Sequence, residues 1–514
     1  MNITEMDLQR IVEEVLQNIS KVETPDNTAG AQPKIETLKE INLQALGNNS
    51  VIEAPHSNLY TQDKGVFDDI NEAIEAADKA QKEFLKNYKL EDREIIINSI
   101  RKTVLENKET LAKMVYEETK LGRYEHKIAK LELTVSKTPG TEDLKTEAYS
   151  GDNGLTIVEQ GPFGVIGAVT PVTNSIETII NNSIGMIAAG NSVVFNVHPS
   201  SKNSCAFVVK LLNESIVQAA GPSNLVNMVR IPTMETLQAL TTHPKIRLLV
   251  GTGGPGLVKT LLQSGKKAIG AGAGNPPVIV DETSDLEHAA KEIIKGASFD
   301  NNILCIAEKE VFVVEQAAEE LIFHMLNNGA YMLSNKELEN IMKFALEENV
   351  NKVARGCSLD NKREYHVAKD WVGKDAKLFL ENMGVRVERP VELLIFETDF
   401  NHPFVQLEQM MPVLPIVRVK NVDEAIELAV KAEHGNRHTA MMHSRNIDNL
   451  TKFAKAVETT IFVKNASSLA GVGAEGEGYT TMSIAGPTGE GLTSAKNFTR
   501  KRRCVLAEGG FRII

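Results

Sequence analysis

The chain has 514 residues, enough for two or three domains, and its 42% hydrophobic and 24% charged residues are ordinary for a soluble globular protein. Its formal net charge of −12 argues against a nucleic-acid-binding protein, and no apolar run reaches the ~18 residues of a membrane-spanning helix. The cysteines, Cys205, Cys305, Cys357 and Cys504, are too widely spaced for a disulfide framework or a zinc site, so we expect a reducing cytoplasm and no metal centre.

The first segment, residues 1–20, is predicted to form an amphipathic helix. Its aliphatic residues recur at helical spacing: Leu8, Ile11, Val12, Val15, Leu16 and Ile19. Residues 21–60 begin with several turn-forming residues and predict a flexible linker. Because a lone helix of this length is marginal in water, it needs a surface that covers its apolar stripe. That surface belongs either to the same enzyme or to another protein.

The next segment is helical from about residue 68 to 133, and the pattern changes after residue 151. Short apolar runs such as "FGVIGAVT", "NSVVFNV", "IRLLV" and "PPVIVD" then alternate with helical stretches. This alternation predicts βαβ units on a largely parallel sheet. It recurs from about residue 310 to 465, which indicates a second α/β domain.

The segment "VTPVTNSIETI", residues 169–179, places Asn174 where a strand gives way to a helix. An asparagine at such a position most simply caps the helix. A side-chain amide at the C-terminal end of a strand is also well placed to donate to an oxyanion. The sequence leaves both interpretations open.

The segment "GTGGPG", residues 251–256, follows the apolar run "IRLLV" and precedes a helical pattern. Gly251, Gly253 and Gly256 match G-x-G-x-x-G in this strand–turn–helix context, where backbone N–H groups can bind a phosphate. However, the dinucleotide-binding fingerprint also has an acidic residue about 20 residues further on, and the chain reads "AGAGNPP" there. The motif is equally compatible with a nucleotide-binding loop and a structural turn.

The segment "SFDNNILCIAEKE", residues 298–310, contains Cys305. A free cysteine is most often a small buried hydrophobic residue. The polar approach "DNN" is unusual for an inert core thiol, but a nucleophile also needs positive potential around its thiolate. The residues alone therefore do not decide between a core thiol and a nucleophile.

In this order, the motifs resemble the aldehyde dehydrogenase superfamily, and more specifically its CoA-acylating branch from bacterial microcompartments. The resemblance spans roughly residue 65 to the C-terminus. It depends on the combination of "GPFGVIGAVTPVTN", "GTGGPG", "SFDNNILCIAEKEV", "LEQMMPV", "EHGNRHTAMMHS" and the ending "TRKRRCVLAEGGFRI". It implies an α/β fold with two parallel-sheet domains and a β-arm for assembly into a homodimer or homotetramer.

The resemblance also implies the domain boundaries. Residues 61–280 would form the dinucleotide-binding domain, with part of the β-arm near 151–163. Residues 281–470 would form the catalytic domain that carries the cysteine. Residues 471–514 would return to the cofactor domain and end in an oligomerisation strand.

The implied catalytic residues are Cys305, as the nucleophile, and Asn174, which would hold the oxyanion together with the Cys305 backbone N–H. The spacing after Pro171 differs by one residue from the superfamily's usual Pro-x-Asn. Thr252 and its neighbouring glycines would contact the phosphates of NAD, and Glu408 the nicotinamide ribose. The implied cofactor-binding residues are Thr170, Pro171, His198, Gly251, Thr252, Gly253, Gly256, Ala271 and Glu408.

One departure from the superfamily is informative. Hydrolytic members carry "E-L-G-G-K-S-P", whose glutamate activates water, and here the matching stretch "AGAGNPP" places Ala271 at that position. General base catalysis is worth ~10²–10⁴-fold, so water should attack a thioester slowly. The expected reaction is a ping-pong oxidation in which coenzyme A takes the acyl group from Cys305.

The expected substrate is a small aldehyde, propionaldehyde first and acetaldehyde second, because one methylene changes binding by only ~1–3 kcal/mol. His438 or His443 could deprotonate CoA, although a structural histidine is commoner. Two rival functions are a hydrolytic, CoA-independent aldehyde dehydrogenase and an inactive homologue that acts as a scaffold.

The N-terminal segment, residues 1–20, is similar to the encapsulation peptides of microcompartment cargo enzymes. Such helices bind a groove on a partner. The resemblance therefore implies shell or cargo proteins as partners, and a location in the lumen of a microcompartment within the bacterial cytoplasm.

Overall fold

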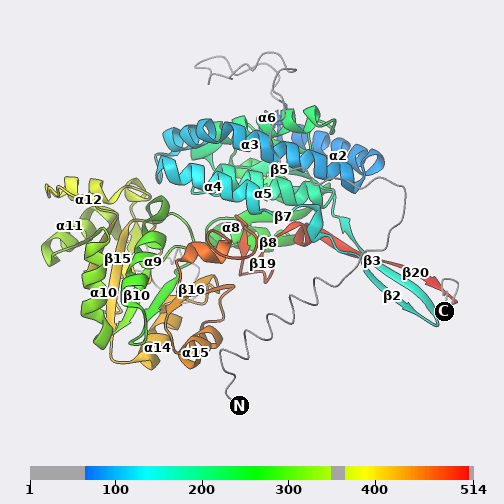
Figure 1. The fold of residues 1–514 in the computed structure, drawn as a ribbon. Helices are drawn as coiled ribbons and strands as arrows, with labels where there is room; N and C mark the ends of the chain where they lie inside the picture. Colours follow the sequence, from blue (N-terminus) through cyan, green and yellow to red (C-terminus); the bar gives the residue numbers. More distant parts are fainter. Residues whose placement is uncertain (1–63, 349–364, 509–514) are drawn as a thin grey trace, which may run out of the picture. The chain divides into compact units, whose positions relative to one another are not determined.

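The computed structural model describes residues 64–348 and 365–508. The predicted N-terminal helix, residues 1–20, and the linker, residues 21–60, lie outside this part of the chain and stay predictions. Figure 1 shows the described part as two α/β bodies and a long β-arm. None of the helices within it is both long enough and apolar enough to cross a membrane.

The described part begins with three helices, α2 (Ile70–Asn87), α3 (Leu90–Thr119) and α4 (Tyr124–Lys137). The side chain of Asp69 accepts from two first-turn N–H groups and fixes the start of α2. The left-handed residue Lys120 ends α3. α2 packs on one face of the first sheet, whereas α3 and α4 lie on the side of its opposite face.

The first sheet has six strands, all parallel to their neighbours. Its order is β1 (Val66–Phe67), β6 (Val226–Val229), β5 (Ser192–Asn196), β4 (Val165–Val169), β7 (Ile246–Thr252) and β8 (Lys267–Ala271). The helices between these strands are α5 (Ser175–Ala188), α6 (Lys202–Gln218), α7 (Met234–Thr242) and α8 (Pro255–Leu262).

Alternate residues of the central strand β4 point to opposite faces of this sheet, as the two-residue period requires. Val165 and Val169 belong to the apolar core shared with α2, α7 and α8. Ile166 and Ala168 belong to the core shared with α3, α5 and α6. Both faces are covered by helices, which explains why these strands read as continuous apolar runs.

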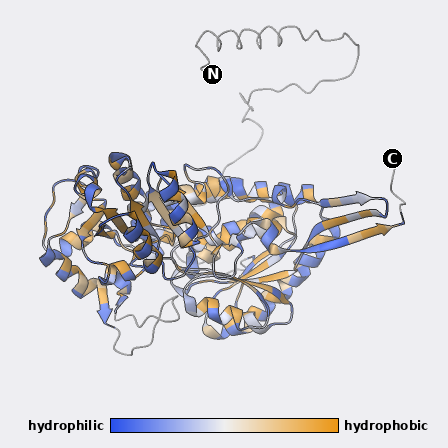
Figure 2. Ribbon diagram, turned by 90° about the horizontal axis from the view of Figure 1, so that it is seen from below, coloured by the Kyte–Doolittle hydropathy of each residue, from blue (hydrophilic) through white to orange (hydrophobic). Residues whose placement is uncertain are grey.

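The second sheet has seven strands, again all parallel. Its order is β11 (Ala330–Met332), β14 (Leu393–Glu397), β15 (Val413–Val419), β10 (Glu310–Val314), β9 (Pro277–Val280), β16 (Thr439–His443) and β17 (Ile461–Lys464). Its helices are α9 (Leu286–Ser298), α10 (Glu315–Asn327), α11 (Asn335–Ala345), α12 (Ala376–Asn382), α13 (Pro403–Gln406), α14 (Val422–Ala432) and α15 (Ile447–Val457). Figure 2 shows hydrophobic residues concentrated on the strands and hydrophilic residues on the outer helices.

The smaller elements complete the two bodies. An antiparallel pair joins β12 (Leu346–Glu348) to β13 (Tyr365–Val367), and another joins β18 (Ile484–Ala485) to β19 (Gly491–Leu492). The single-turn helices are η1 (Thr141–Asp143), η2 (Pro199–Ser201), η3 (Phe299–Asn302), η4 (Lys369–Trp371), η5 (Ser468–Val472) and η6 (Ala495–Phe498).

The chain passes from the first sheet to the second between Ala271 and Pro277, a few residues before the boundary predicted at 280. After β17 it returns to the first body, where Gly270 N–H donates to Thr488 Oγ1 at 3.1 Å. The α/β class with two parallel sheets, predicted from the sequence, is confirmed.

The β-arm consists of three antiparallel strands: β2 (Glu147–Gly151), β3 (Gly154–Pro162) and β20 (Thr499–Ala507). It extends away from the two bodies in Figure 1. Every residue of β20 after Thr499 is exposed, including the basic run from Arg500 to Arg503. The oligomerisation expected of this arm stays a prediction.

Candidate active site

The predicted coenzyme residues lie at one edge of the first sheet. Thr170 follows β4, His198 follows β5 by two residues, and Thr252 and Ala271 end β7 and β8. Because these four strands are adjacent and parallel, their carboxyl ends meet at the same edge. The strand order reverses between β4 and β7, and open α/β sheets bind ligands in the crevice at such a switch point.

The loop after β7 leads directly into α8, with Gly254 at the N-cap. A Cβ on Gly251 would lie 2.2 Å from a methyl group of Leu261, so this glycine is needed where α8 packs on β7. The Gly253 N–H donates to Ala271 O at 3.0 Å. Built Cβ atoms on Gly254 and Gly256 meet no heavy atom of the described residues within 4 Å. The loop thus combines a structural turn with an open helix N-terminus, which favours a phosphate.

Two further features fit a dinucleotide in this crevice. Thr170 Oγ1 is buried and has no hydrogen-bond partner among the described residues. Gly274 N–H donates to Glu408 Oε1 at 3.3 Å, and both residues line a cavity of about 320 Å³ together with Gly254 and Lys369. The predicted ribose ligand and the N-terminus of α8 therefore share one cavity.

Two other predicted coenzyme residues have side-chain partners within the protein. Thr252 Oγ1 lies 2.8 Å from Ser483 Oγ, and exposed His198 accepts from Ser200 N–H at 3.2 Å.

The turn before Cys305 is unusual because Asp300, Asn301 and Asn302 all have positive φ, at 50°, 54° and 66°. Asn and Asp tolerate this left-handed region better than most residues, because their short polar side chains bond locally. Asn301 Nδ2 donates to Gly373 O at 3.0 Å, and Asn302 Nδ2 donates to Ala297 O at 2.8 Å. The polar "DNN" approach therefore builds a buried, hydrogen-bonded support for the cysteine.

The half-buried Cys305 lines a cavity of about 640 Å³ together with Asn174, Lys130 and Phe299. The structure thus brings together the predicted nucleophile and the predicted oxyanion ligand. Burial, followed by the negative charge of Glu408, raises the pKa of Cys305 to about 12. Lys309 and the backbone N–H groups near the sulfur act in the opposite direction. In this state the thiol is protonated at neutral pH.

The substitution Glu408→Gln is expected to make Cys305 more reactive, because it removes the negative charge that destabilises the thiolate. The alkylation rate of Cys305 by iodoacetamide at pH 8 should rise roughly three- to tenfold, since each pKa unit changes the thiolate fraction tenfold. Peptide mass spectrometry across a pH series measures this rate, with buried Cys205 as an internal control. An unchanged or slower alkylation would contradict the expectation that the Glu408 carboxylate raises the pKa of Cys305.

Two buried charged residues that the sequence did not single out, Glu308 and Lys309, follow Cys305 in the chain. Lys309 is fully buried, and its Nζ donates to Asn302 Oδ1 at 2.5 Å and Leu304 O at 3.2 Å. Burial lowers its pKa to about 8 and raises the pKa of Glu308 to about 7. Their signal in the sequence is the charged run "EKE" at the entry to β10, a strand buried along its whole length.

The stretch "AGAGNPP", residues 271–277, passes beside Cys305 at Gly274. A Cβ on Gly274 would lie 2.7 Å from Cys305 O and 3.0 Å from the ring of His438. Ala271 is only 2% exposed, and its methyl side chain cannot act as a base. Gly274 N–H donates to Glu408, the carboxylate whose negative charge helps to raise the pKa of Cys305.

The two histidines considered for CoA activation are both buried. Burial lowers the pKa of His438 to about 4, with a further contribution from Lys309, and lowers that of His443 to about 3. Both are therefore neutral near pH 7. His438 Nδ1 lies 2.9 Å from Thr439 Oγ1, and its contact with Gly274 puts it near Cys305, so a role in CoA activation stays a prediction.

Asn174 occupies the N-cap position of α5, but its side chain makes no capping hydrogen bond within the described structure. Its Oδ1 instead accepts from Lys130 Nζ at 2.7 Å. Of the two interpretations left open by the sequence, this geometry favours an amide available for another task.

A doubly wound sheet with an open helix N-terminus at its switch point, next to a cysteine-lined cavity, defines a class of dinucleotide-dependent enzymes. The chain belongs to the aldehyde dehydrogenase family, whose family model matches residues 49–502. The family predicted from the sequence is thereby confirmed.

The chain is similar over nearly its whole length to several characterised relatives. The acetylating acetaldehyde dehydrogenase of Salmonella typhimurium is 47% identical over 451 residues, which cover 88% of this chain and 94% of the relative. The CoA-propanoylating propanal dehydrogenase of the same organism is 45% identical, covering 93% of this chain and 98% of the relative.

Two solved structures share this fold. A propionaldehyde dehydrogenase from the Clostridium phytofermentans fucose utilisation microcompartment has a TM-score of 0.81 and 49% identity, covering 87% of this chain and 99% of its own. The Rhodopseudomonas palustris propionaldehyde dehydrogenase, solved with bound CoA and an acylated cysteine, has a TM-score of 0.83 and 49% identity, covering 88% and 100%.

Proposed function

We propose that the chain oxidises a short aldehyde to an acyl-CoA, with Cys305 as the acyl carrier and propionaldehyde as the preferred substrate. The observation that carries this proposal is the shared cavity of Cys305 and Asn174, beside a stretch in which Ala271 replaces the hydrolytic glutamate. The CoA-acylating activity is that of the relatives that match nearly the whole chain.

In the first half-reaction, the Cys305 thiol first loses its proton to water, and the thiolate then attacks the carbonyl carbon, so that a C–S bond forms as the C=O π bond breaks. The negative charge passes to the carbonyl oxygen, where Asn174 Nδ2 and the Cys305 backbone N–H donate to it. The hydride that leaves the aldehyde carbon would pass to NAD, which the residues at the carboxyl edge of the first sheet would hold. Cys305 then carries the acyl group as a thioester.

In the second half-reaction, the thiolate of CoA attacks the thioester carbonyl, and the bond to Cys305 breaks. The acyl group leaves as a thioester of CoA and the cysteine is regenerated. The residues proposed to hold the dinucleotide are Thr170, Pro171, His198, Gly251, Thr252, Gly253, Gly256, Ala271 and Glu408. Of these, Gly251 acts through the packing of α8 and Gly253 through its bond to Ala271.

We expect the enzyme to prefer propionaldehyde over acetaldehyde. The cavity at Cys305 is lined by apolar residues that include Leu133, Phe299 and Val472. One methylene against such a wall contributes only ~1–3 kcal/mol, so both aldehydes are expected to react. Comparing kcat/KM for aldehydes of two, three and four carbons measures the preference.

Sustained turnover is expected to require CoA, because the acyl-enzyme lacks a positioned base for water. With propionaldehyde and NAD alone, NADH should form only to about one equivalent of enzyme, and added CoA should restore continuous formation. Absorbance of NADH, with propionate and propionyl-CoA quantified at the end, measures this. Continuous CoA-free formation of propionate would instead support a hydrolytic aldehyde dehydrogenase.

For residues 1–20, the proposed partner is a shell or cargo protein of a bacterial microcompartment. The supporting observations are the amphipathic pattern of this segment and the microcompartment origin of the Clostridium relative. A fluorescent protein fused to residues 1–20 should form puncta in a shell-producing host, while deletion of these residues should leave activity in solution nearly unchanged. A diffuse signal equal to that of the unfused protein would contradict the proposal.

The proposed assembly is a homodimer or homotetramer that uses the β-arm. The arm presents exposed apolar side chains on two of its strands: Tyr149, Val505 and Leu506. Such residues on an exposed strand favour pairing with a second copy.

A further inference from the structure

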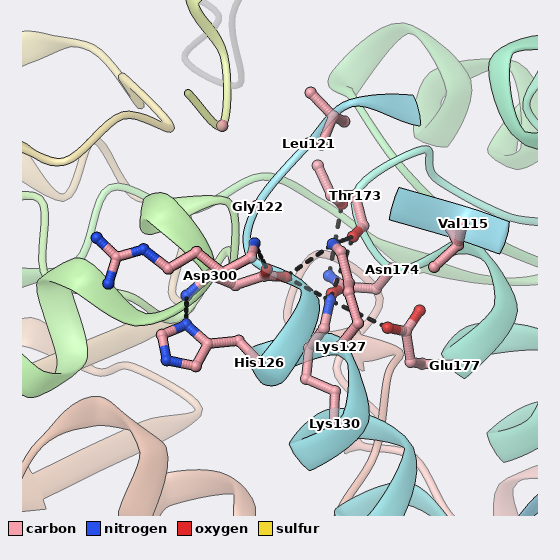
Figure 3. Close-up of polar contacts among 12 residues, drawn as sticks. Val115, Leu121, Gly122, His126, Lys127, Lys130, Thr173, Asn174, Glu177 and Asp300 are labelled. Carbon is pink, nitrogen blue, oxygen red and sulfur yellow. Dashed lines mark hydrogen bonds and ion pairs between the residues drawn. The ribbon is translucent and has the colours of Figure 1, made fainter. Parts of the chain in front are cut away.

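A buried cluster of charged side chains lies beside Asn174, between α4 and α5 (Figure 3). Lys127 and Lys130, one helical turn apart on α4, pair with Asp300 Oδ2 at 2.8 and 2.6 Å. Lys130 also pairs with Glu177 on α5 at 3.1 Å. The two lysines are almost equally buried, with exposed fractions of 1% and 2%.

The two lysines differ in their relation to the candidate active site. Lys130 Nζ donates to Asn174 Oδ1 at 2.7 Å, and Lys130 lines the cavity that contains Cys305. Within the described structure, Lys127 neither bonds to Asn174 nor lines this cavity. Its Nζ donates to Asp300 Oδ2 and, at 3.5 Å, to Thr173 O. Figure 3 shows both amines near Asp300, with the Lys130 amine against the Asn174 amide.

The bond between Lys130 and Asn174 fixes which end of the amide faces which way. An ammonium group has donors and no acceptor, so the amide must turn its oxygen toward Lys130. The Nδ2 group then faces away, and its described bond to Thr173 Oγ1 is long, at 3.4 Å. An unheld amide could rotate and present its oxygen to the cavity, where it would repel an oxyanion.

The charge on Lys130 is secured by its surroundings. Burial lowers the pKa of this amine, but the carboxylates of Asp300 and Glu177 outweigh burial and raise it above its ordinary value. Burial also acts on Asp300, but Lys127 and Lys130 lower its pKa to about 2. Lys130 therefore stays a donor across the pH range of an assay.

We infer that Lys130 is a positioning residue, which holds the Asn174 amide so that its Nδ2 group can donate to the developing oxyanion. This inference rests on the proposed role of Asn174. Its pairing with Asp300, in the turn before Cys305, is shared with Lys127, so the bond to Asn174 is what distinguishes Lys130.

The test is a double-mutant cycle that compares first-turnover rates of NADH formation from propionaldehyde without CoA. Asn174→Ala removes the proposed oxyanion donor and should slow this rate ~10²–10³-fold. Lys130→Met should slow it ~10–100-fold in the wild-type background, since a misplaced group costs up to about that much. In the Asn174→Ala background it should change the rate by less than about twofold.

The matched control is Lys127→Met, which removes an equally buried lysine from the same carboxylate but leaves the bond to Asn174. Its rate should stay within about twofold of wild type. Both lysine substitutions should lower the thermal unfolding temperature. If Lys130→Met does not fold, the charge-balanced variant Lys130→Met/Glu177→Gln replaces it, with Glu177→Gln as its reference.

The outcomes separate the inference from the proposal on which it rests. A wild-type rate in Asn174→Ala would overturn the proposed role of Asn174 itself. If Asn174→Ala is slow and adding Lys130→Met lowers its first-turnover rate by as large a factor as in the wild-type background, the positioning role alone would be overturned. Equal losses in Lys127→Met and Lys130→Met would do the same, because they would indicate a structural effect.

Discussion

The substitution Cys305→Ala is expected to abolish aldehyde oxidation, with a loss of ~10⁴-fold or more in kcat. Removing the nucleophile of a covalent mechanism leaves only binding and electrostatic stabilisation, which accounts for the size of this loss. NADH formation from propionaldehyde with NAD and CoA measures it. Because Cys305 is half-buried in a cavity wall rather than in the core, the variant should fold normally.

The matched control is Cys504→Ser on the exposed strand β20, which should retain the wild-type rate. NAD binding to Cys305→Ala, followed by fluorescence titration, should also be retained. A Cys305→Ala variant that oxidises propionaldehyde at a comparable rate would remove the cysteine from the mechanism.

The substitution Ala271→Glu is expected to create a CoA-independent activity. It places a carboxylate at the position that the sequence resemblance matches to the base of hydrolytic members, in the stretch that passes beside Cys305 at Gly274. Hydrolysis of the acyl-enzyme should rise ~10²-fold, since general base catalysis contributes ~10²–10⁴-fold. Propionate formed from propionaldehyde and NAD without CoA measures the gain.

Ala271→Gln is the control for size, because glutamine fills the same volume without a base. Since Ala271 is buried, the introduced carboxylate should titrate above its ordinary pKa, and the new hydrolysis should increase as the pH rises through that value. Equal hydrolysis in the glutamine and glutamate variants would show that the missing base does not explain the preference for CoA.

The elements that the sequence predicted correctly are those with strong local signals. The apolar runs around Val165 and Val278 are too short for helices and lack polar alternation, and both became strands buried on two faces. The passage from one sheet to the other was harder to locate. "PPVIVD" reads as one more strand in a series, and its partners, β10 and β16, lie far along the chain.

The candidate site was predictable only in part. Cys305 and Asn174 were predicted and share one cavity. Whether the asparagine caps its helix was not predictable, because that depends on Lys130 from a distant helix. Lys127 and Lys130 look like solvent-facing charges within "EHKIAKLE", and only the fold reveals that they are buried. The left-handed "DNN" turn was likewise hidden, since its hydrogen bonds reach residues such as Gly373.

Mass spectrometry of the enzyme after incubation with propionaldehyde and NAD shows whether Cys305 carries an acyl group until a thiol takes it. We expect one propionyl group on the peptide that contains Cys305, and this group should persist in buffer and disappear on addition of CoA as propionyl-CoA forms. An adduct on a different residue, or one lost to water as fast as to CoA, would contradict it.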